Sequence, residues 1–66
     1  MASVRDFEER YHVKFITGKL FVDLWVDEEY SDKYYVSLDF NIIDSFFAKS
    51  DEDAIKIFEE RSERYG

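Results

Sequence analysis

The sequence predicts an α+β fold, in which a three- or four-stranded antiparallel β-sheet carries one C-terminal α-helix packed on one face. We expect a single small domain that spans residues 1–66. Apolar residues recur at every second position over 20–27 and 34–40, the spacing of strands with one buried face. Gly18 separates two strand-like runs, and a helix-capping pattern begins at Ser50. These three observations together predict the fold class.

The stretch from Leu20 to Asp27 organises the predicted sheet, because its two faces differ in character. One face is wholly aliphatic and suits a core, whereas the other alternates aromatic with acidic side chains and is unusual for plain solvent. The aliphatic face consists of Leu20, Val22, Leu24 and Val26. The mixed face consists of Phe21, Asp23, Trp25 and Asp27.

The first 19 residues predict a short helix followed by a strand. Residues 3–10 fit both a helical spacing and a strand alternation, and we expect a short helical lead-in before a strand over about 11–17. A tight hairpin turn at 17–19 would use the conformational freedom of Gly18. The pairing would then add Tyr11, Val13 and Phe15 to the aliphatic face and His12, Lys14 and Ile16 to the mixed face.

The second half of the chain predicts one further strand, an uncertain segment and a helix. Residues 27–33 have turn composition, and residues 34–40 alternate with Tyr34, Val36, Leu38 and Phe40 inward. Residues 42–48 fit either a fourth strand or a covering loop. Ser50 and Asp53 form a capping box for a helix over about 51–64. Its buried stripe is expected to contain Ala54, Ile55, Ile57, Phe58 and Tyr65.

Composition restricts the classes of partner. The formal net charge is −7, from 16 acidic and nine basic residues, so a phosphate backbone or an anionic membrane surface would be repelled. A basic or nucleic-acid-binding host protein is the electrostatically favoured partner, with no direct nucleic acid and no membrane. The chain contains no cysteine and no apolar run long enough to span a bilayer, and we expect a cytoplasmic protein.

Residue types that carry catalysis or hold metals are not arranged for either purpose. His12 lacks a neighbouring nucleophile and orienting group, and no glycine-rich phosphate loop exists. The carboxylates of 27–32 lack the spacing and central glycine of a calcium loop, and Asp23 with Asp39 is expected to be a solvated surface pair. We therefore expect no catalytic residues, no metal site and no cofactor, and a protein that is not an enzyme.

The mixed face is the candidate binding surface, and two interpretations of it stay open. Another part of this chain, the N-terminal segment or Phe46–Phe47, could cover it as a second small core. Alternatively it is a recognition surface with aromatic anchors and acidic surroundings, for another protein or for a second copy in a homodimer. The candidate partner-binding residues are Phe21, Asp23, Trp25, Asp27, Glu28, Glu29, Asp32, Tyr35 and Asp39.

The stretch Phe-Ala-Lys-Ser-Asp-Glu-Asp-Ala at 47–54 is similar to a strand-to-helix junction of many small α+β proteins. With its short, acidic, cysteine-free composition, the chain resembles the small inhibitors that phages make against host enzymes. This resemblance implies a viral or mobile-element inhibitor or regulator, and it transfers no functional residue. The hypothesis is a non-enzymatic acidic protein-binding module, in one form a DNA mimic. The alternative is a structural homo-oligomer subunit that buries its aromatic sheet face.

Overall fold

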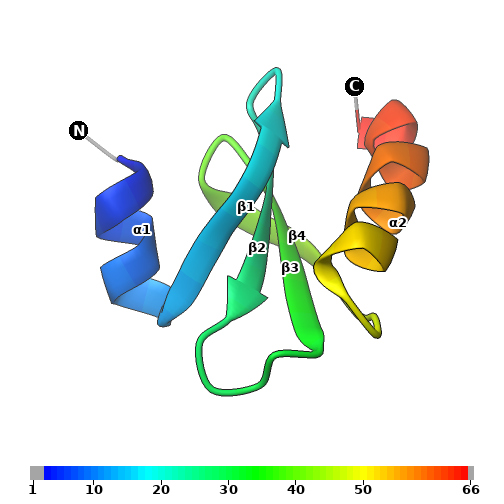
Figure 1. The fold of residues 1–66 in the computed structure, drawn as a ribbon. Helices are drawn as coiled ribbons and strands as arrows, with labels where there is room; N and C mark the ends of the chain where they lie inside the picture. Colours follow the sequence, from blue (N-terminus) through cyan, green and yellow to red (C-terminus); the bar gives the residue numbers. More distant parts are fainter. Residues whose placement is uncertain (1–2, 66) are drawn as a thin grey trace.

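A computed structural model of the protein describes residues 3–65 and confirms the α+β fold with a four-stranded antiparallel sheet. The strands follow one another in space in chain order, β1-β2-β3-β4. Figure 1 shows the sheet between two helices, with α1 on one side and α2 on the other. The elements are α1 (Val4–Tyr11), β1 (Val13–Lys19), β2 (Val22–Asp27), β3 (Lys33–Leu38), β4 (Asn41–Phe47) and α2 (Asp51–Tyr65).

The larger core lies between the sheet and α2, as the aliphatic face of β2 predicted. Its buried members are Val22, Leu24, Tyr34, Val36, Phe46, Ala54 and Phe58. The ring of Tyr34 stacks on Phe46 at 5.8 Å, and its hydroxyl donates to the Asp51 carboxylate at 2.7 Å. Ser50 caps α2 as expected, because its Oγ accepts the N–H of Asp53 at 3.2 Å.

The C-terminal half of α2 is fastened to β4 by a single carboxylate. Asp44 accepts a hydrogen bond from Arg61 Nη1 at 2.6 Å and another from the Tyr65 hydroxyl at 2.7 Å. It also accepts the backbone N–H of Ser45 at 2.8 Å. These donors lower the pKa of Asp44, with the Tyr65 hydroxyl as the largest cause, so the carboxylate remains ionised in the folded protein at a lower pH than in an unfolded chain.

A second, smaller core lies on the other face of the sheet, under α1. Phe7 of α1 stacks on Trp25 with ring centroids 4.1 Å apart, and Phe40 lies 6.0 Å from Phe7. Val13 completes the buried set, and Trp25 is 0% exposed. Of the two interpretations of the mixed face, the structure shows the one in which residues 3–10 cover Trp25.

The first hairpin turns two residues later than the sequence predicted. β1 continues through Gly18 to Lys19, and the turn is the dipeptide Leu20–Phe21, so the expectation of a turn at 17–19 was wrong. Gly18 instead leaves space for a neighbouring side chain: a Cβ at this position would clash with a carboxylate oxygen of Asp23, which would have to move. Leu20 is consequently exposed rather than part of the aliphatic face.

The expected orientation of the first strand was also wrong. Val13 pairs with Asp27 and Phe15 with Trp25, which places both apolar side chains on the α1 face. A β-bulge makes Ile16 an extra residue between the pairs Phe15–Trp25 and Thr17–Leu24. Counted from the hairpin turn, this extra residue moves Val13 and Phe15 to the α1 face, while Ile16 packs on the α2-side core. His12 lies outside the strand. Its positive φ of 56° ends α1, where its N–H donates to the Glu8 carbonyl.

The hairpin of β3 and β4 differs from the expected bounds of the third strand, and it shows that residues 42–48 belong largely to a fourth strand. β3 ends at Leu38, and the dipeptide Asp39–Phe40 forms the turn, so Phe40 joins the α1-side core rather than the α2-side core. Residues 41–47 form the fourth strand. Ile43 is an extra residue at a bulge, between the pairs Val36–Asp44 and Ser37–Ile42. This irregularity explains why the segment lacks a clean alternation.

Candidate functional site

The predicted partner-binding residues are distributed over three places in the fold. Trp25 is in the core, and Asp23 lies half-buried on β2 beside Gly18. The end of the sheet that carries the loop between β2 and β3 holds Asp27, Glu28, Glu29, Asp32 and Tyr35. The opposite end, which carries both hairpin turns, holds Phe21 and Asp39. The nine residues therefore do not form one surface.

Trp25 has a structural role in this conformation. Its indole Nε1–H donates to the Ser37 hydroxyl at 2.7 Å, and both side chains are 0% exposed. A buried indole normally has such an acceptor, because an unpaired N–H in an apolar environment is costly. Ser37 occupies the position opposite Asp23 on β3, on the same face as Trp25. Ser37 lies two residues after Tyr35, so the strand pattern predicted that both side chains share this face. The pattern did not show that the Ser37 hydroxyl accepts the indole hydrogen bond.

Asp27 organises the loop end rather than presenting a free charge. Its carboxylate accepts the N–H of Glu29 at 2.8 Å, the N–H of Tyr30 at 3.1 Å and the hydroxyl of Tyr35 at 3.1 Å. These bonds, the two backbone bonds first, lower the pKa of Asp27. Burial, followed by the bond to Asp27, raises the pKa of Tyr35. Glu28, Glu29 and Asp32 are exposed around this turn.

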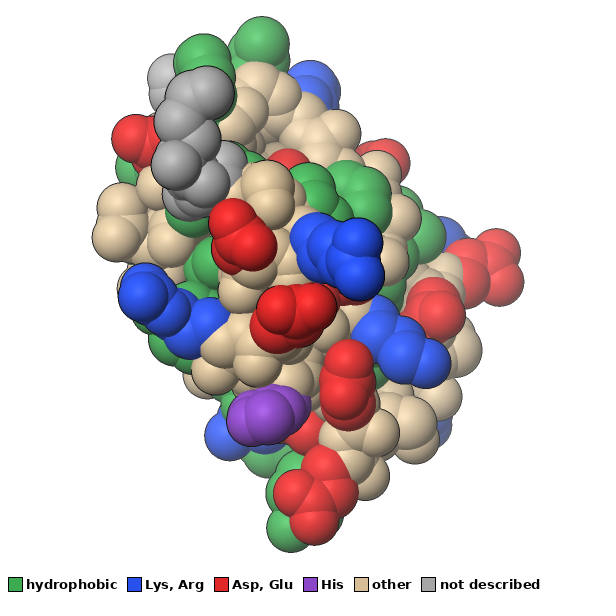
Figure 2. All heavy atoms as spheres, turned by 90° about the vertical axis from the view of Figure 1, so that its left-hand side faces the viewer, with side chains coloured by type: hydrophobic (Ala, Val, Ile, Leu, Met, Phe, Trp, Pro, Cys, Tyr) green, Lys and Arg blue, Asp and Glu red, His purple; other side chains and the backbone are tan. Residues whose placement is uncertain are grey.

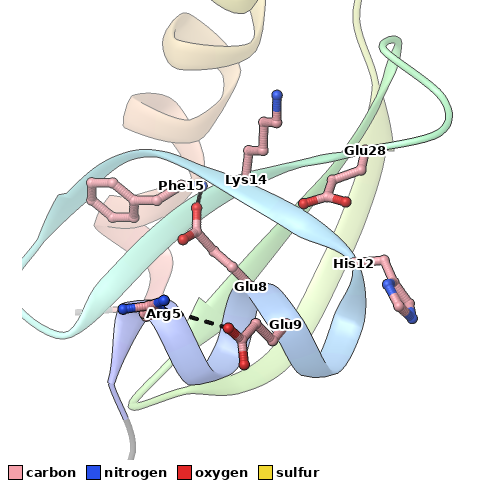
Figure 3. A pocket seen from close by; sticks show the side chains of 7 residues that line it. All are labelled: Arg5, Glu8, Glu9, His12, Lys14, Phe15 and Glu28. Carbon is pink, nitrogen blue, oxygen red and sulfur yellow. Dashed lines mark hydrogen bonds and ion pairs between the residues drawn. The ribbon is translucent and has the colours of Figure 1, made fainter.

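An open hollow of about 650 Å³ lies between α1, β1 and the loop end. In Figure 3 Glu8 points to the backbone of β1, where it accepts the Phe15 N–H at 2.9 Å, and Glu9 pairs with Arg5 at 3.6 Å. His12 lies at the margin with its ring turned outward. The hollow is therefore lined by carboxylates that stabilise α1 and the edge of β1, and it shows no nucleophile–base–orienter geometry. Its residues are Arg5, Glu8, Glu9, His12, Lys14, Phe15 and Glu28.

The turn end carries the most exposed apolar side chains in the described part of the chain. Leu20 is 82% exposed and Phe21 is 77% exposed, with φ angles of 49° and 71°. Two-residue hairpin turns with positive φ at both positions favour Asn-Gly, because bulky L-residues are strained there by about 1–2 kcal/mol each. We call the dipeptide Leu20–Phe21 the tip. Sequence reasoning identified Phe21 but assigned Leu20 to the core.

The other two-residue turn, Asp39–Phe40, has the same backbone conformation, but its residues tolerate that conformation better than those of the tip. Asp39 and Phe40 have φ angles of 50° and 63°. Asp tolerates this conformation, and the half-buried ring of Phe40 packs near Phe7 and Trp25, which offsets its strain. The Asp39 N–H donates to the Phe21 carbonyl at 2.9 Å, so the two turns are joined. Of the two turns, only the tip has strain without packing that compensates it.

The helix α2 flanks the tip on one side, and most of its exposed charged side chains are acidic. A hollow of about 190 Å³, lined by Lys19, Leu20, Val22, Ser62 and Glu63, places the tip beside the C-terminal half of the helix. Exposed acids along α2 outnumber the exposed bases Lys56 and Arg64; they are Asp51, Glu52, Asp53, Glu59, Glu60 and Glu63. On the α1 side, by contrast, Figure 2 shows acidic and basic side chains interspersed. Acids are thus in excess along α2, as they are in the loop between β2 and β3.

Comparison of the chain with known protein families, with curated proteins and with solved structures finds no match. Over residues 3–65, no group of three or more potential ligand side chains is arranged to hold a metal ion. No helix in that range has the length and apolar character needed to cross a membrane.

Proposed function

We propose that the protein is a non-enzymatic acidic protein-binding module, with the tip as its apolar anchor and the exposed face of α2 as its charged flank. The observation that carries the proposal is the pair of strained, exposed side chains at Leu20 and Phe21. Residues held in an unfavourable backbone region without compensating burial are found disproportionately at functional sites. A protein partner would supply the burial that the isolated chain lacks.

The charge distribution supports a basic partner. Six exposed acids lie along α2, of which Glu63 lines the hollow beside the tip, and the chain as a whole carries −7. Long-range attraction to a basic surface would accelerate association and weaken with salt, whereas burial of the tip would be insensitive to salt. The module would compete with nucleic acid if the partner's basic surface is a nucleic-acid site, and it would then act as an inhibitor of a host protein.

The turn itself offers a test that separates binding from folding. Replacing the tip by Asn-Gly, as Leu20→Asn with Phe21→Gly, supplies the residues that this turn prefers. The fold should become more stable by about 1–3 kcal/mol through relief of strain, while partner capture from an extract of the source cells should be lost. Urea unfolding measures the first effect, and capture on immobilised protein with mass spectrometry measures the second.

A matched control uses an exposed aromatic residue away from the tip. Tyr30 is 59% exposed in the loop at the opposite end of the sheet, and Tyr30→Ser should leave capture unchanged. Capture that persists in the Asn-Gly variant and fails in Tyr30→Ser would contradict the proposal and move the site to the loop end. Repeating the capture over a range of salt concentrations determines how much of the affinity belongs to the acids of α2.

A further inference from the structure

The outer edge of β4 is the most open strand edge of the sheet. β4 is last in the strand order, so one side of it pairs with β3 and the other side faces no strand among the residues described. Its exposed apolar side chains are Ile42, Ile43 and Phe47, which are 39%, 42% and 67% exposed. An edge of this kind is a template for pairing with another strand.

The opposite edge, β1, is protected by contrast. Lys14 and Lys19 place charges on it, and the Phe15 N–H donates to the Glu8 carboxylate of α1. Charged side chains, covered backbone groups and β-bulges are the usual devices that prevent edge pairing. β4 has a bulge at Ile43 but only one charged residue, Asp44, and that carboxylate is turned to α2 by Arg61 and Tyr65.

We infer that β4 is a self-association surface, through which two copies of this chain pair their β4 strands antiparallel into a continuous eight-stranded sheet. The inference goes beyond the proposed function and uses a different surface from the tip. The second copy is favoured because the strand is self-complementary. A two-fold axis at Ser45 places Ile43 opposite the partner's Phe47 in both directions, and Asp44 opposite the partner's Phe46. No like charges stand directly opposite each other across the two strands, although each chain carries −7.

The one covered amide of β4 does not prevent this pairing. The Ser45 N–H donates to Asp44 in the single chain, and in the dimer it would donate to a partner carbonyl instead. Asp44 would keep its bonds from Arg61 and Tyr65, so neither group is left without a partner. Because one hydrogen bond is exchanged for another, association is driven by burial of the three apolar side chains, and we expect a weak affinity that is measurable only at high protein concentration.

Sedimentation equilibrium tests the inference over about 10 µM to about 1 mM, a range that extends to such high concentrations. The wild-type mass should rise from 8.0 kDa toward twice that value. Phe47→Lys and Ile43→Lys should each hold the mass at the monomer value, because they place charge on the edge. Leu20→Lys, which makes the same charge change at the exposed tip, should dimerise like the wild type.

Circular dichroism of each variant verifies that the sheet is intact, which is expected because the substituted side chains are exposed. Amide shifts of residues 41–47 should depend on concentration, while those of β1 should not. A wild type that stays at 8.0 kDa throughout overturns the inference. So does a dimer that survives both lysine variants of β4, or one that Leu20→Lys abolishes.

Discussion

The hydrogen bond between Trp25 and Ser37 supports a quantitative prediction for Ser37→Ala. The hydroxyl is the acceptor of the indole N–H at 2.7 Å, and both groups are fully buried. Ala is nearly the size of Ser, so the change creates little cavity and leaves mainly an unpaired buried donor. That costs about 1–3 kcal/mol. A 66-residue domain is expected to have a total stability of about 3–10 kcal/mol, so the loss is a large fraction of it.

The assay uses the single tryptophan of the chain as its probe. Trp25 emission should report unfolding in urea as one transition, with the midpoint of Ser37→Ala lowered and the slope unchanged. Ser45→Ala is the matched control, because Ser45 neighbours Tyr35 across the sheet but is exposed. Its stability should stay within about 0.5 kcal/mol of the wild type.

A double-mutant cycle isolates the bond itself. In a Trp25→Phe background the donor is absent, so Ser37→Ala should cost much less than in the wild type when both are followed by circular dichroism. An unchanged urea midpoint in Ser37→Ala would refute the reasoning. An equal cost in the two backgrounds would assign the effect to packing rather than to the hydrogen bond.

Three further predictions concern pH and the core. The pKa of Asp44 is lowered from its ordinary 3.8, so its contribution to the free energy of unfolding is present above that pH and is lost as the pH falls through the folded-state pKa. In Asp44→Asn, the free energy of unfolding measured with urea should therefore fall less steeply with decreasing pH. Burial, then the bond to Asp51, raises the pKa of Tyr34 from 10.0 to about 12, so its contribution to the free energy of unfolding is intact below pH 10.0 and is lost as the pH rises toward about 12. An ultraviolet titration of Tyr34→Phe should therefore lack the tyrosine ionisation near the high-pH end that the wild type shows. Trp25→Ala should cost about 3–5 kcal/mol, enough to populate the unfolded state in circular dichroism, and a fully folded variant would contradict its place in the core.

The sequence predicted the elements best where alternation or capping is regular. The aliphatic residues of β2 recur at every second position, and Ser50 with Asp53 forms a regular capping pattern. The packing of β2 against α2 and the start of α2 could therefore be predicted. Bulges removed that regularity in β1 and β4, and a one-residue shift transfers every side chain beyond the bulge, counted from the hairpin turn, to the other face. Val13 and Phe15 were misassigned for this reason.

The candidate site was less predictable than the fold, and Trp25 and the tip show two physical reasons for this. Trp25 faces α1, and a run such as 3–10 that fits both helix and strand cannot show which surface it covers. The tip escaped prediction because Leu and Phe are among the last residues expected in a turn with positive φ, whereas Gly18 nearby is among the first. The same contradiction between residue type and conformation is the reason for proposing the tip as a binding site.

The attachment of α1 has a consequence for the motions of the molecule. Among the residues of α1, all of which the structure describes, only Phe7 is buried. An eight-residue helix has little stability of its own, so we expect α1 to open at a lower free energy than the sheet. Such an opening would break the Glu8–Phe15 hydrogen bond and uncover Trp25 and the ring of Phe40, an aromatic surface that Phe7 covers in the closed molecule.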